Sequence, residues 1–134
     1  MMRTSITTAF ILFLATCASC GPDGGGSTST GSGIPRSTTF AMLSSAQAGA
    51  ECDYLNGKQG GYGRSVTCSD GSTETTDDSK ASCVADAPAV GAACPTFTVG
   101  DAEDCASAVG ANLCSVTTQS ACAAFRACLA SVGG

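Results

Sequence analysis

The sequence of 134 residues contains no histidine and no tryptophan. The absence of histidine excludes the commonest general base near neutral pH, the Ser–His and Cys–His nucleophile pairs, and zinc sites that need imidazole. Aromatic residues are also scarce, with five Phe and two Tyr. A folded core must therefore be built mostly from small or aliphatic side chains and cysteine sulfur. These absences indicate a protein that is not an enzyme and that needs no cofactor.

Basic residues are few, because six Lys and Arg stand against eleven Asp and Glu, for a net charge of −5. This charge argues against a nucleic-acid partner, since binding to phosphates needs a basic surface that displaces counterions. It also has the wrong sign for docking on anionic lipid head groups. Long hydrophobic runs are lacking too: the apolar run at residues 6–18 falls short of the roughly 20 residues that span a bilayer.

Residues 1–19 have the pattern of a secretory signal peptide. One basic residue, Arg3, precedes the apolar run, and the small residues Ala18, which ends the run, and Ser19 come before Cys20. A short basic region, a short apolar region and small residues before a cleavage point are the features of such a signal. A buried core helix is the alternative, but a Gly- and Ser-rich stretch follows the run at once. The sequence therefore predicts an exported chain.

The end of this signal resembles the lipobox of bacterial lipoproteins, in which a Leu and two small residues precede a Cys that becomes lipidated. Cys17 and Cys20 both fit imperfectly, because Thr16 is bulky before Cys17, and Cys17 stands where Leu is usual before Cys20. Lipidation of Cys20 leaves an even eight cysteines in the mature chain, whereas lipidation of Cys17 leaves one unpaired thiol. Cys20 is the preferred lipidation site and Cys17 the alternative.

The resemblance to lipoproteins implies a membrane anchor. Gly21 follows Cys20, so the aspartate that retains many lipoproteins at the inner membrane is absent from that position. The expected location is therefore the outer membrane or the cell surface. Residues 20–38 comprise the lipidated Cys and a flexible tether of Gly, Ser, Thr and Pro, which could extend over about 60 Å.

Residues 39–134 are expected to form a small disulfide-rich domain that is mainly α, with about three short helices and a two-stranded β-hairpin. Helical spacing of apolar residues predicts a first helix over residues 40–57, capped by Thr38 or Thr39. The same spacing predicts a last helix over residues 118–132.

The middle helix is predicted to begin after Thr98, where Asp101 completes a capping box, and to end at residues 110–112. Glu103 and Asp104 would also lie in its first turn, where the helix dipole favours negative charge. Helix capping therefore accounts for this acidic cluster, and a metal or catalytic role is the alternative.

The hairpin is predicted from a strand at residues 65–68 and a returning strand at residues 81–85. A Cys68–Cys83 bridge would then close a loop of about 15 residues and contribute roughly 3 kcal/mol. The acidic segment between the strands is expected to be a solvated loop, with a weak cation site as the alternative. That site would lack the central Gly and the terminal Glu of an EF-hand, and its oxygen ligands would come from Asp70, Ser72, Glu74 and Asp77.

Cysteine is abundant, with ten residues, which is close to the level of secreted disulfide scaffolds. Reduced cytosolic proteins rarely use so many, and zinc binding by Cys17 and Cys20 would need a second C-x-x-C pair that the chain lacks. Cys122 and Cys128 lie about 120° apart on the predicted last helix, so they should bond different partners. We expect no metal site, and four disulfides among Cys52, Cys68, Cys83, Cys94, Cys105, Cys114, Cys122 and Cys128.

The segment GGYGR at residues 60–64 is a candidate contact loop. Tyr62 offers an aromatic face between glycines, and Arg64 adds a charge. Aromatic and arginine side chains are the residue types that concentrate binding energy at interfaces. A plain connecting loop is the alternative interpretation.

The stretches GGYGRSVTCSDG and TVGDAEDC…ACAAFRACL are similar to uncharacterised cysteine-rich lipoproteins of the myxobacterial type, over residues 50–134. That resemblance implies no activity. The sequence favours a lipid-anchored, disulfide-stapled envelope or surface protein with a binding or structural role. Its expected partners are the membrane, through the lipid, and an envelope or extracellular protein or ligand. The alternatives are a soluble secreted protein cut by the general signal peptidase, and a weak cation-binding or enzymatic domain.

Overall fold

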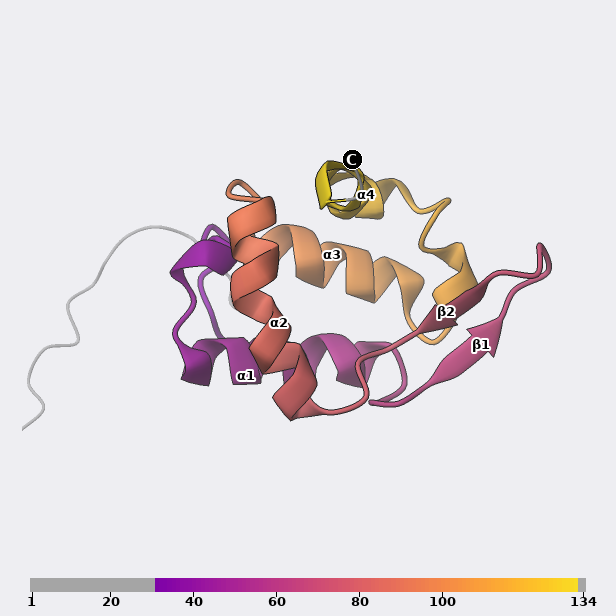
Figure 1. Cartoon of the computed structure of the whole chain (residues 1–134), viewed down its shortest axis with the longest axis horizontal. Helices are drawn as coiled ribbons and strands as arrows, with labels where there is room; N and C mark the ends of the chain where they lie inside the picture. The colour runs from indigo at the N-terminus through magenta and orange to yellow at the C-terminus, as the bar shows by residue number, and fades with distance from the viewer. Residues whose placement is uncertain (1–30, 133–134) are drawn as a thin grey trace, which may run out of the picture.

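The computed structural model describes residues 31–132, so the expected signal peptide, both candidate lipidation sites and most of the tether lie outside the described residues. The described part is mainly helical and disulfide-rich, as the sequence predicts (Figure 1). Within it, no helix is long and apolar enough to cross a membrane. The elements in chain order are η1 (Phe40–Met42), α1 (Ser45–Lys58), β1 (Ser65–Thr67), β2 (Thr73–Thr75), α2 (Lys80–Ala93), α3 (Val99–Val109), η2 (Leu113–Ser115), η3 (Ser120–Cys122) and α4 (Ala123–Val132).

Helix α1 begins later than predicted. Ser44 is its N-cap: the Ser44 hydroxyl accepts the Gln47 amide hydrogen, and the Gln47 side chain accepts the Ser44 amide hydrogen. This reciprocal capping box fixes the start of the helix, and the residues before it form the separate 3₁₀ turn η1. The caps predicted at Thr38 and Thr39 are therefore wrong.

Helix α2 occupies residues 81–85, where a strand was predicted. Ser79 and Ser82 form a second reciprocal capping box, which starts a helix that continues through Pro88. A proline inside a helix costs about 3 kcal/mol, so tertiary packing must offset it. Helix α2 packs on α1 and η1. The approach of η1 is so close that a Cβ on Gly91 would lie 2.6 Å from the backbone of Ala41.

The hairpin is shorter than predicted. Strand β1 is confirmed, but its partner is β2, with Val66 opposite Glu74 in an antiparallel register. The turn between the strands includes Gly71 at a φ of 84°, a conformation that favours glycine, and the Cys68 amide donates to the Ser72 carbonyl. The chain therefore reverses within five residues, before it reaches the segment predicted to return.

Helix α3 confirms its predicted start and end. Thr98 and Asp101 form the capping box, and Gly110 at a φ of 53° terminates the helix. Two further amides of the first turn are satisfied by the preceding chain, because Val99 donates to the Thr38 carbonyl and Gly100 to the Arg36 carbonyl. The first amide groups of any helix have no partner within the helix, and the preceding chain supplies partners for these two.

The same contacts correct the predicted extent of the tether. Residues 31–38 pack against α3, and Ile34 within them is only 5% exposed. The Arg36 side chain bridges both Glu103 and Asp104. The packed part of the chain thus begins at least eight residues before the boundary predicted at residue 39.

Four disulfides join the eight cysteines. The predicted Cys68–Cys83 bridge is wrong, because Cys83 lies on α2 and bonds Cys52 of α1. The four disulfides confirm that Cys122 and Cys128 have different partners. The pairs are Cys52–Cys83, Cys68–Cys114, Cys94–Cys128 and Cys105–Cys122.

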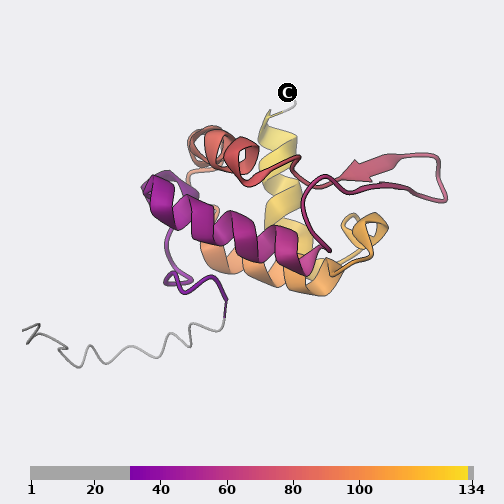
Figure 2. The ribbon, with the colours of Figure 1, turned by 90° about the horizontal axis from the view of Figure 1, so that it is seen from below.

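Helices α1 and α3 run side by side, while α4 is seen end-on in Figure 1 and lengthwise in Figure 2, so it crosses them. We call residues 40–63 and 78–132 the helical body, and residues 64–77 the hairpin arm, which projects beyond it (Figures 1 and 2). One apolar cluster surrounds Val109, Leu113 and Cys122, and a second surrounds Phe97 and Ala102. The last predicted helix is confirmed over α4, although its first turn is the 3₁₀ turn η3.

Candidate functional site

A cavity of about 290 Å³ lies between the helices and the base of the hairpin arm. This volume is close to the lower end of the range for small-molecule sites, which is roughly 300–1,000 Å³. Helices α1, α2 and α3 supply most of the wall, and Phe125 of α4 contributes an aromatic ring. The wall is mostly apolar, and among the described residues that line it there is no Lys or Arg. Its polar members include Glu51, Asn56, Gln59, Thr76, Asp77 and Asp86.

Glu51 is the most unusual of these lining residues. It lies on α1 between the lining residues Ala48 and Leu55, and only 1% of it is exposed. Within residues 31–132, neither of its carboxylate oxygens has a hydrogen-bond partner. A buried carboxylate without a donor is costly, because water has been removed and nothing replaces it. Such a group marks a functional candidate.

The protonation of Glu51 follows from this burial. Desolvation raises the pKa of Glu51 to about 7, and the negative charge of Glu103 adds to the rise. A hydrogen bond from the Ser32 hydroxyl would lower the pKa of Glu51. In the structure, however, this hydroxyl donates to Glu103 Oε1 at 2.9 Å. Glu51 is therefore poised between its neutral and charged forms near neutral pH.

Asn56 supplies a second unsatisfied acceptor on the cavity wall. Its side-chain nitrogen donates to the Cys52 carbonyl at 3.0 Å and to Asp77 Oδ2 at 3.1 Å. Its Oδ1 atom is buried and has no partner in the part of the chain that the structure describes. The cavity wall therefore includes two residues with buried acceptor atoms that lack donors among residues 31–132, two atoms on Glu51 and one on Asn56.

Glu103, the neighbour of Glu51, differs because it is satisfied. It is 3% exposed, and its Oε1 accepts the Ser32 amide at 2.7 Å as well as the Ser32 hydroxyl. Its Oε2 pairs with Arg36 at 3.3 Å. Helix capping explains Asp101 as predicted, whereas Glu103 and Asp104 hold residues 31–36 against α3. The sequence-based account of this acidic cluster was therefore incomplete.

The candidate contact loop is engaged with the rest of the fold. The Tyr62 hydroxyl donates to Asp53 Oδ1 at 3.0 Å, and burial, followed by the hydrogen bond to Asp53, raises the pKa of Tyr62 to about 12. The Arg64 guanidinium donates to the carbonyls of Gln59 and Ala111. Both side chains are half-buried, so each supports the loop, and their role as a contact surface stays a prediction.

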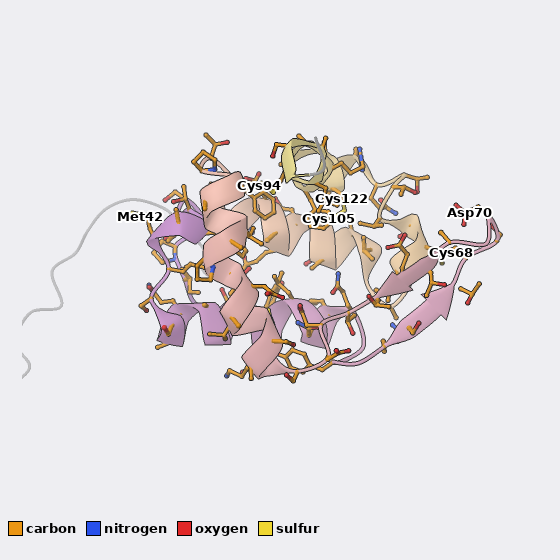
Figure 3. The ribbon with its side chains drawn as sticks, in the orientation of Figure 1. Met42, Cys68, Asp70, Cys94, Cys105 and Cys122 are labelled. Atoms are coloured by element: carbon orange, nitrogen blue, oxygen red, sulfur yellow. A yellow bond between two sulfur atoms is a disulfide. The ribbon has the colours of Figure 1, made fainter. Side chains whose placement is uncertain are left out.

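The four residues proposed as oxygen ligands of the alternative cation site do not lie close together. Asp70 lies at the tip of the hairpin arm (Figure 3), where its carboxylate accepts both the amide and the hydroxyl of Ser72. Asp77 lies at the base of the arm, bonded to Asn56, and strand β2 separates the two acids. Among residues 31–132, no group of three or more acids or cysteines is placed to hold a metal ion.

Sequence reasoning missed the cavity and Glu51. The available signal was a lone acid at position 51 of a helix whose inward face otherwise carries Ala48, Cys52 and Leu55 at three- and four-residue spacing. That pattern places a carboxylate on a buried face. It does not reveal whether a donor from another element meets the carboxylate there.

Comparison with known proteins finds no relative of this chain. No protein-family model matches the chain, and neither the curated proteins nor the solved structures give a match.

Proposed function

We propose that this chain is a lipid-anchored, disulfide-stapled domain of a bacterial cell envelope, and that it works by binding rather than by turnover. The disulfides support export, because four of them indicate an oxidising, extracytoplasmic environment. The signal-like residues 1–19 and the lipobox-like sequence before Cys20 support the anchor. Two or three acyl chains on Cys20 hold a protein stably at a membrane, whereas one chain does not.

The observation that carries the binding role is the cavity. It combines an apolar wall with a small number of buried polar atoms, and this combination is typical of ligand sites. Support for a role without turnover comes from the sequence, which has no histidine to act as general base. Some acids outside the cavity have structural partners, for example Asp101 in the α3 cap and Asp53 with Lys80 at 2.6 Å.

The position of the packed residues also suits a tethered domain. The fold already engages the chain at Gly31, beside Glu103, so at most residues 21–30 separate the proposed lipid from the packed chain. Fully extended, ten residues span at most about 35 Å. The domain would therefore stand close to the membrane, at a distance shorter than a free tether to residue 38 would allow.

Fatty-acid labelling tests the anchor. Wild-type chain and the variants Cys20→Ala and Cys17→Ala are expressed with a labelled fatty acid, and the membrane fractions are separated by density. We expect label and outer-membrane placement in the wild type and loss of both in Cys20→Ala. Labelling that persists in Cys20→Ala but disappears in Cys17→Ala would assign the lipid to Cys17. Label in neither the wild type nor the variants would favour the soluble secreted form.

A further inference from the structure

We propose that the cavity binds a small organic ammonium ion with an apolar body, whose positive group lies against the Glu51 carboxylate. The inference deepens the binding role proposed above and rests on it. Its basis is that the site has buried acceptor atoms without matching donors. Glu51 and Asn56 present three buried acceptor atoms, and no donor within residues 31–132 meets them.

The charged residues that line the cavity favour a positively charged ligand. Glu51, Asp77 and Asp86 line it, and the described lining residues include no Lys or Arg. Glu103 lies close behind Glu51 on α3, but its charge is already paired with Arg36. An anionic ligand would meet three carboxylates and no positive charge among the described lining residues. An ammonium group brings one positive charge and hydrogen-bond donors for the Glu51 carboxylate, and so supplies what the wall lacks.

The apolar residues of the wall favour a ligand whose remaining part is apolar. The rings of Phe40, Phe97 and Phe125 all line the cavity, with Phe97 centred 5.2 Å from Phe40 and 6.3 Å from Phe125. An apolar body would displace water from these surfaces, and aromatic faces also attract cations. A bare metal ion is a poor fit, because it needs several oxygen ligands at once, and Glu51 and Asn56 lie five residues apart on α1.

Titration of the mature, disulfide-bonded protein with 2-phenylethylamine tests the proposal. Protein NMR at pH 7.5 follows the amide signals, with the neutral 2-phenylethanol and the anionic phenylacetate as ligands of the same shape. We expect saturable shifts at residues on the cavity wall, such as Val90, Ala102 and Ala106. The amine should bind at least tenfold more tightly than the alcohol, and phenylacetate should not saturate.

Two variants and one matched control sharpen the test. Glu51→Gln should weaken binding of the amine at least tenfold and leave binding of the alcohol within twofold. Ala106→Leu, which fills the cavity without changing a charge, should abolish binding of both. Glu74→Gln, the same chemical change in the hairpin arm, should alter neither, because Glu74 does not line the cavity.

Equal affinity for amine and alcohol would overturn the proposal, as would full amine affinity in Glu51→Gln or in Ala106→Leu. Shifts confined to the outer surface would overturn it too. The fatty-acid labelling has a separate readout, so a failure of the proposed anchor and a failure of amine binding are told apart.

Discussion

The helical body and the hairpin arm are held together by different forces. The body contains two apolar clusters and three of the disulfides, and its residues Val99 and Cys122 are completely buried. Each strand of the arm exposes its two flanking residues and half-buries only its central residue, Val66 in β1 and Glu74 in β2. It is joined to the body by Cys68–Cys114 and by polar contacts of Arg64, Thr76 and Asp77.

This difference shows how a chain with few aromatic residues distributes its stability. The rings of Phe40, Phe97 and Phe125 and most of the buried aliphatic side chains of the described residues lie in the body. The arm has too little apolar surface to form alone, because an isolated hairpin is marginally stable at best. A covalent bond and backbone-directed hydrogen bonds replace the missing core. The arm should therefore be the part that opens first.

Removal of the body disulfide Cys105–Cys122 should have the largest effect. Its loop of 17 residues corresponds to about 3 kcal/mol in the chain-entropy model. Both sulfur atoms are buried in the core between α3 and η3 (Figure 3), so vacating that space adds roughly 1 kcal/mol. Cys105→Ala with Cys122→Ala should lose about 4 kcal/mol in chemical unfolding. A loss under about 1 kcal/mol would show that the body does not depend on this bridge.

The buried charge in the body should have the next largest effect, through pH. The pKa of Glu51 is raised to about 7, so the folded state favours the protonated form. The contribution of Glu51 to stability is therefore greatest below about pH 4.5, falls as the pH rises towards 7, and then levels off. The shift from 4.5 to about 7 corresponds to at most about 3 kcal/mol.

Glu51→Gln should abolish this fall and leave the variant more stable than the wild type at pH 8, as measured by urea unfolding from pH 4.5 to 8. The arm provides the control, since Glu74→Gln should keep the wild-type profile. A wild-type stability that is flat across this pH range would contradict the burial of an ionisable Glu51.

Removal of the arm disulfide should cost less than removal of the body disulfide, although its loop of 46 residues is longer. Chain entropy alone ranks the arm bridge higher, at about 4 kcal/mol. The released arm, however, also gains freedom in the folded state, and this offsets part of the loss. For Cys68→Ala with Cys114→Ala we expect a loss of about 2 kcal/mol.

Hydrogen exchange of the same variant locates the effect. Backbone amides of residues 64–77 should lose protection, while those of α1 and α3 keep it. Loss of protection throughout α1 would mean that arm and body unfold as one unit, and the distinction between them would fail.

The smallest effect is expected at the junction of arm and body. Tyr62→Phe removes only the hydrogen bond to exposed Asp53, which corresponds to about 0.5 kcal/mol. Thermal unfolding should therefore hardly change. Tyr62→Ala combined with Arg64→Ala serves in a pull-down from the cell envelope. Equal recovery of partners with the wild type and the double variant would show that the loop is only a connector.

Local signals account for what the sequence predicted well. The start of α3 rests on Thr98 and Asp101, three residues apart, and its end rests on Gly110. Strand β1 and the last helix likewise follow from spacing within one short segment. Where a local signal was overlooked, as in the Ser79 and Ser82 cap of α2, the element was assigned wrongly.

The sequence by itself determined the disulfide-rich helical class and an oxidising environment, because composition and caps act within a few residues of chain. Only the tertiary structure decided the cysteine pairing, since eight cysteines allow 105 combinations that spacing does not distinguish. It also decided that Arg36 meets Glu103, 67 residues away, and that Glu51 meets no donor among residues 31–132. The reason is physical: the cost of burying a charge depends on which distant groups the fold brings to it.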